Sequence, residues 1–214
     1  MATMTKFLQD LYDFPPGRIV EPWEDKDQFL THWGFTIYRT HYGPDSDHQW
    51  SSLLKHIISG VEASLLELEE NDTEYDKQPG AATKALHQFR LDARSDVAML
   101  DGLALEEVRE LYLDGSGGQP MNTENRPWRL FLLADAQVLQ DPDLRLVKAA
   151  AADYDPGALV SRNNRSGPQR YFGWITMPTT AVCNLYAQLD TFWLEQIVNR
   201  TAGGPGAFWD PEDD

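Results

Sequence analysis

The chain has 214 residues, of which 42% are hydrophobic and 11% aromatic, and its formal net charge is -16 at pH 7. This length suits one domain with a proper core and is too short for two, while the hydrophobic content excludes a disordered chain. The single cysteine, Cys183, excludes an internal disulfide framework and any multi-cysteine zinc or iron–sulfur site.

The N-terminal residues lack the apolar run of a signal peptide, and no stretch reaches the roughly 18 apolar residues of a membrane span. We therefore expect a cytoplasmic protein without a membrane partner. The acidic charge opposes contact with nucleic-acid phosphates, but much of it is concentrated in residues 62–76 and at the C-terminal end. The rest of the chain is closer to neutral, which leaves room for a basic patch.

Residues 1–32 are expected to form an N-terminal arm that packs on the domain, with a short helix near residues 5–12. An aromatic strand follows at residues 33–43, where Phe35, Ile37, Arg39 and His41 share one face. A buried strand seldom places an arginine on its core side unless an anionic group receives it. This strand is therefore a site candidate, and the alternative is a strand end that emerges into water.

Three helices are predicted next. The first has apolar residues at helical spacing from Trp50 to Leu65, after a turn and N-cap at residues 43–46. An exposed loop is expected at residues 76–80, and a second helix at about residues 82–93. A third helix is expected at residues 105–112, ended by the glycines that follow it.

Three strands and a closing helix complete the prediction. The strands are expected at residues 128–133, 144–150 and 171–177, and the helix runs from Pro178 to Ile197. We predict an α+β fold with a single domain at residues 33–202 and an acidic C-terminal tail at residues 203–214. Its sheet, mixed or mostly antiparallel, should have about four strands packed with four to five helices.

Two aspartates follow predicted strands. Asp135 comes directly after one strand and Asp153 follows another by a few residues, so a pair of carboxylates could hold a cation or act as acid and base. Antiparallel neighbours place such ends at opposite edges of a sheet, so the sequence leaves open whether the two meet. N-capping of the following helix is the favoured reading of Asp135.

Two groups of arginines are candidate anion sites. Arg162, Arg165 and Arg170 lie in a long loop and could clamp a phosphate or carboxylate, with a solvated surface loop as the alternative. Arg90 and Arg94 are one turn apart if residues 82–93 are helical, and local ion pairs are the alternative reading there.

The commonest catalytic motifs are absent from the sequence. It contains no Gly-x-Ser-x-Gly elbow, Cys183 lies among apolar residues as an inert thiol would, and no two histidines have metal-ligand spacing. Its glycine cluster lies between a helix and a strand, which is the wrong context for a nucleotide. We therefore expect neither a metal nor a cofactor.

Several motifs are distinctive as a set: residues 33–43 with Trp50, residues 130–135, Val147-Lys148 with Asp153-Tyr154, and residues 173–178 with Leu185-Tyr186. Together they resemble a large group of small, mostly uncharacterised filamentous-fungal proteins and, within it, the fungal arginine-containing cyclodipeptide synthases. The resemblance implies a transferase that joins an arginyl residue to a second aminoacyl residue, both delivered on tRNA. Such an enzyme releases a diketopiperazine and uses no ATP of its own.

This chemistry requires an acidic pocket for the guanidinium group, for which the available carboxylates are Asp135, Asp153 and Asp155. His41 or a carboxylate is expected to deprotonate the incoming amine, while Arg39 or Tyr38 steadies the ester oxyanion or the ribose. The predicted tRNA contacts are Arg162, Arg165 and Arg170. These roles follow from residue type and position, because no known motif residue carries them over.

The competing function is a non-catalytic protein- or ligand-binding module, favoured by the acidity of the chain and by the lack of a nucleophilic serine. An enzyme predicts a pocket in which Arg39 or His41 meets a strand-end aspartate. A binding module predicts that these residues are dispersed and solvated.

Overall fold

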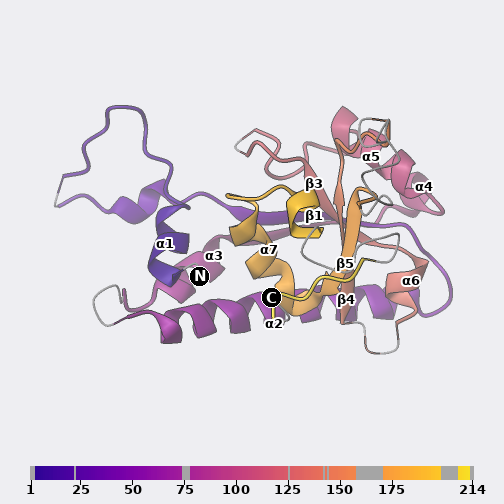
Figure 1. The fold of residues 1–214 in the computed structure, drawn as a ribbon, viewed down its shortest axis with the longest axis horizontal. Helices are drawn as coiled ribbons and strands as arrows, with labels where there is room; N and C mark the ends of the chain where they lie inside the picture. The colour runs from indigo at the N-terminus through magenta and orange to yellow at the C-terminus, as the bar shows by residue number, and fades with distance from the viewer. Residues whose placement is uncertain are drawn as a thin grey trace, which may run out of the picture.

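The computed structural model describes residues 3–21, 23–73, 78–124, 126–141, 143, 145–157, 171–198 and 207–212. Across these residues the fold is α+β, with one mixed sheet between two groups of helices (Figure 1). The predicted class is therefore confirmed. The sheet has five strands, one more than predicted. The described residues form eight α-helices, compared with the four to five predicted, and several of these helices are short.

The strand order is β2-β1-β3-β4-β5. Parallel pairing joins β1 (Trp33–Arg39) to β2 (Phe89–Arg94) on one side and to β3 (Leu130–Ala134) on the other. Antiparallel pairing then joins β3 to β4 (Leu146–Ala151) and β4 to β5 (Trp174–Pro178). The carboxyl ends of β1, β2 and β3 therefore share one edge of the sheet, and the end of β4 lies at the opposite edge.

Helices cover both faces of the sheet, since parallel neighbours need crossover connections. The main core lies under α1 (Met4–Gln9), α2 (Ser46–Asn71), α3 (Ala81–Gln88) and α7 (Val182–Gln188). A smaller core lies on the other face, under α4 (Val97–Leu100) and α5 (Leu105–Asp114). Figure 1 shows α2 along the bottom of the view, with α4 and α5 at the upper right beyond the sheet.

β2 is the element that the sequence analysis assigned wrongly. The predicted helix at residues 82–93 ends at Gln88, and Phe89 begins a strand that lies in register with Trp33. Arg90 and Arg94 are therefore about 13 Å apart along a strand and not one helical turn apart. Local ion pairing is confirmed for Arg94, whose guanidinium group lies 2.8 Å from the Asp92 carboxylate.

The predicted closing helix is divided into η2 (Thr179–Ala181), α7 and α8 (Leu194–Val198). Its apolar stripe continues across the break, because Leu189 and Leu194 are both buried in the main core. Beyond it, Trp209 of the acidic tail is also fully buried there. The backbone around Trp209 adds to the free edge of β5 through hydrogen bonds with Thr176.

The N-terminal arm is anchored by Asp72, the residue that ends α2. Its carboxylate accepts hydrogen bonds from the backbone nitrogens of Met4 (2.9 Å) and Thr5 (3.1 Å), at the start of α1. We expect Asp72→Ala to lower the free energy of unfolding by about 2 kcal/mol, because the two amides lose a charged acceptor. Urea denaturation should show this loss. The exposed neighbour Glu70 provides the control, and Glu70→Ala should change the value by less than about 0.5 kcal/mol.

Candidate functional site

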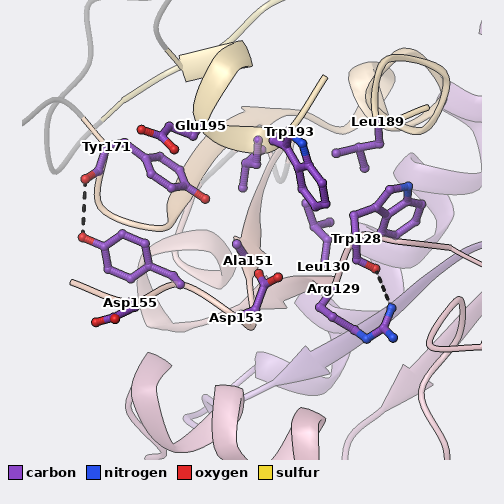
Figure 2. Close-up of a pocket in the computed structure, with 12 residues that line it drawn as sticks. Trp128, Arg129, Leu130, Ala151, Asp153, Asp155, Tyr171, Leu189, Trp193 and Glu195 are labelled. Atoms are coloured by element: carbon purple, nitrogen blue, oxygen red, sulfur yellow. Dashed lines mark hydrogen bonds between the residues drawn. The ribbon is translucent and has the colours of Figure 1, made fainter. Parts of the chain in front are cut away.

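A cavity of about 250 Å³ opens at the edge of the sheet where β3 begins and β4 ends (Figure 2). Three parts of the chain build it: the start of β3, the residues on either side of the β4–β5 connection, and the region of α8. Four aromatic side chains form much of its wall, namely Trp128, Tyr154, Tyr171 and Trp193. Trp128 is buried, whereas Trp193 is 53% exposed.

The two tyrosines pack against each other. Their rings are 5.4 Å apart at an interplanar angle of 90°, and the Tyr154 hydroxyl donates a hydrogen bond to the Tyr171 carbonyl oxygen at 3.4 Å. Burial raises the pKa of Tyr171, and the nearby charges of Asp153 and Glu195 raise it further. The phenol of Tyr171 therefore stays neutral at physiological pH and faces two carboxylates.

Charged side chains give the cavity an excess of negative charge: Asp153, Asp155 and Glu195 against Arg129. Two of the four are already engaged, since Arg129 donates to the Arg126 carbonyl oxygen (2.7 Å) and Asp155 accepts from the Gly157 amide (2.7 Å). Among the described residues, Asp153 and Glu195 have no hydrogen-bond or ion-pair partner. Figure 2 shows Glu195 beside Tyr171, Asp153 across the cavity from it, and Asp155 at the outer edge.

Asp135, the third predicted carboxylate, lies at the other edge of the sheet. It caps α6 (Ala136–Leu139), as predicted, by accepting a hydrogen bond from the Val138 amide at 3.1 Å. Its second oxygen is 2.5 Å from Lys148 Nζ. Since β3 and β4 are antiparallel, Asp135 and Asp153 follow strands that end at opposite edges, so these two carboxylates do not form one site.

Arg39 is used to hold the start of α2. It is 4% exposed, and its guanidinium group contacts Asp47 (2.7 Å), Ser46 Oγ (2.7 Å) and the His41 carbonyl oxygen (3.0 Å). The carboxylate that receives this arginine thus comes from the helix that follows. In the part of the chain that the structure describes, Arg39 therefore pairs with a helix aspartate and not with the strand-end aspartate that an enzyme would require.

The other two predicted catalytic residues also lie outside the cavity. His41 follows β1 at the same edge as Arg39. Tyr38 is fully buried in the smaller core, where burial raises its pKa to about 12. The remaining predicted site residues, Arg162, Arg165 and Arg170, lie outside the described residues.

Several other features of the described chain bear on function. Cys183 is a free, buried cysteine, as the sequence predicted, and burial raises the pKa of its thiol to about 12. No group of His, Cys, Asp and Glu side chains within the described ranges could hold a metal ion. None of the described helices has both the length and the apolar character needed to cross a membrane.

The sequence analysis did not identify three residues that shape the cavity. Trp193 and Glu195 were assigned to a continuous helix, although they belong to the break before α8 and to its first turn. Arg109 of α5 lies behind the wall and contacts the Tyr154 ring at 4.9 Å. A sequence signal for Arg109 does exist, since it occupies the apolar stripe formed by Leu105, Val108 and Tyr112.

Comparisons with family models, with curated proteins and with solved structures give no match to this chain. A functional proposal for this chain therefore depends on the geometry of the cavity and on the motifs of the sequence.

Proposed function

We propose that the cavity beside β3 and β4 binds a guanidinium group and that the protein is a tRNA-dependent cyclodipeptide synthase that accepts an arginyl residue. The observation that carries the proposal is the pair of carboxylates, Asp153 and Glu195, that face an aromatic cavity without a partner among the described residues. The guanidinium ligand is also the one that the resemblance of the sequence to arginine-containing cyclodipeptide synthases implies.

The wall chemistry favours guanidinium over a simple ammonium group. A guanidinium ion is planar, stacks on aromatic faces, and offers several N–H donors to carboxylates. The cavity combines both kinds of partner, because tyrosine and tryptophan rings and acidic side chains all line its wall. Its volume of about 250 Å³ suits an amino-acid side chain and is small for a nucleotide.

The proposed reaction needs this cavity as its arginine site. The α-amine of one aminoacyl ester attacks the ester carbonyl of the other, so that a C–N amide bond forms and a C–O ester bond breaks. The released ribose hydroxyl takes up the proton lost by the amine. The free amine of the resulting dipeptidyl ester then attacks its own ester carbonyl in the same way, which closes the ring.

A binding experiment tests the ligand. We expect L-arginine methyl ester to bind in isothermal titration calorimetry, and Asp153→Asn to weaken it about tenfold or more through loss of a charge-assisted hydrogen bond. Glu195→Gln should have a similar effect. Asp114→Asn, at an exposed site at the end of α5, is the control and should leave the affinity unchanged.

The neutral isostere L-citrulline methyl ester separates charge recognition from shape. It should bind far more weakly than the arginine ester, because it lacks the positive charge that the carboxylates receive. Equal binding of the two esters, or equal binding by wild type and Asp153→Asn, would contradict the proposed guanidinium site.

The catalytic part of the proposal has a separate test. The chain, expressed in a bacterial host, should release arginine-containing diketopiperazines that mass spectrometry detects in the medium. The product should disappear in folded Asp153→Asn. Well-folded protein that gives no product and binds no tRNA at low salt would exclude the synthase.

A non-catalytic ligand-binding module is the second candidate function. It is favoured by the position of Arg39 and His41, since these predicted catalytic groups do not line the cavity. Binding of the arginine ester without diketopiperazine formation would support this alternative.

A further inference from the structure

We infer that Arg109 is the positioning residue of the cavity. Its side chain joins the segment that leaves β4 to the segment that enters β5, and it thereby fixes Tyr154 in the cavity wall. The inference deepens the proposed function and rests on it only where ligand affinity is concerned. Arg109 belongs to α5 and does not itself line the cavity.

The contacts of Arg109 form a fork. Its Nε donates to the carbonyl oxygen of Ala151, the last residue of β4, at 2.9 Å. Its Nη2 donates to the carbonyl oxygen of Gly173, the residue before β5, at 3.1 Å. The same Gly173 oxygen also accepts a hydrogen bond from the Ala151 amide at 2.9 Å. Arg109 therefore binds both segments at the point where their backbones already pair.

The guanidinium group also lies against the cavity wall. Its Cζ atom is over the Tyr154 ring, 4.9 Å from the ring centre, and Tyr154 in turn packs edge-on against Tyr171. Arg109 is only 8% exposed, and its one carboxylate neighbour among the described residues, Glu106, is 3.7 Å away on the surface. Burial lowers the pKa of Arg109, so backbone carbonyls and the tyrosine ring compensate a cation that water reaches poorly.

These contacts require an arginine. A lysine ammonium group is a single point charge. It cannot reach the carbonyl oxygens of both Ala151 and Gly173 while it also lies against the Tyr154 ring. Arg109→Lys therefore keeps the charge and removes the fork. A matched control is Arg94→Lys, because Arg94 is similarly buried on the same face of the sheet and also binds backbone carbonyls, those of Gly118 (2.8 Å) and Gln119 (3.0 Å).

The experiment observes Tyr154 and Tyr171 by ¹⁹F NMR in the absence of a ligand. Protein labelled with 3-fluorotyrosine gives ¹⁹F resonances that Tyr154→Phe and Tyr171→Phe assign. We expect both resonances to shift in Arg109→Lys and to remain in place in Arg94→Lys. The dissociation constant for L-arginine methyl ester should rise about tenfold in Arg109→Lys and stay unchanged in Arg94→Lys.

The outcomes separate this inference from the proposed function. Unshifted tyrosine resonances in folded Arg109→Lys, or equal shifts in both lysine variants, overturn the positioning role. Shifted resonances in a protein whose wild type does not bind the ester support the positioning role and contradict the proposed function. If Arg109→Lys does not fold, Tyr154→Leu removes the ring that Arg109 supports. The Tyr171 resonance must then move, and an unchanged resonance overturns the inference.

Discussion

Gly34→Ala is expected to destabilise the protein by at least about 4 kcal/mol, a large part of the total stability of a domain of this size. Gly34 has a φ of 132°, which an alanine adopts only with strain. A Cβ atom at this position would also overlap the carbonyl oxygen of Arg90 and lie 3.1 Å from Phe89 Cε2. Relief requires that β1 and β2 separate, because the Arg90 oxygen belongs to the neighbouring strand.

Urea denaturation followed by tryptophan fluorescence measures this effect, since Trp33 precedes Gly34 in the main core. Gly80→Ala is a matched control: its φ of 80° is also positive, but a Cβ there has no atom within 4 Å. The control should lose only about 1 kcal/mol through backbone strain. A Gly34→Ala protein that is no less stable than Gly80→Ala would contradict the close approach of β1 and β2 at this point.

The same region shows why the sequence predicted most of the fold but not β2. Long elements with one clear period, such as α2 and α5, were predicted because many apolar residues repeat at helical spacing. Residues 89–94 do alternate between apolar and polar side chains, as a strand does, but only over six positions, and they directly follow a real helix. A pattern this short does not decide between helix and strand, and pairing with β1 decides the conformation of these residues.

The candidate site was less predictable than the fold. Asp153 and Asp155 do lie at a cavity, whereas Asp135 ends a strand at the opposite edge of the sheet. The sequence predicts where each strand ends, but it does not predict whether neighbouring strands run parallel or antiparallel. Nor could it show that Glu195, from a distant part of the chain, lies across the cavity from Asp153, because that proximity depends on the packing of α8.

Arg109 shows how a residue type in an unexpected position can indicate function. It lies in the apolar stripe of α5, where a charged side chain is buried and must find compensating partners. The sequence alone shows that such partners are needed. Which groups they are depends on the end of β4 and the start of β5, which lie about 40 and 60 residues further along the chain.

Gly173→Ala is expected to have the largest effect on the cavity itself. Gly173 has a φ of 77°, and a Cβ there would overlap both Tyr154 Cγ and Arg109 Nη2. An alanine must displace the tyrosine ring, the guanidinium group or both, so the cavity wall, the fork of Arg109 or both are disturbed. We expect a loss of about 3 kcal/mol in stability. The affinity for L-arginine methyl ester should fall by more than about tenfold, a loss measured by calorimetry on the folded fraction.

A double-mutant cycle identifies the cause of this loss. In a Tyr154→Ala background the ring is absent, so Gly173→Ala should cost much less than it does in the wild type, and the remaining loss reports backbone strain and the Arg109 contact. The coupling should be at least about 1 kcal/mol, since the two side chains would occupy the same space. Additive effects would mean that Gly173 does not make room for Tyr154. In that case the close packing of Gly173, Tyr154 and Arg109 could not be what holds the cavity in shape.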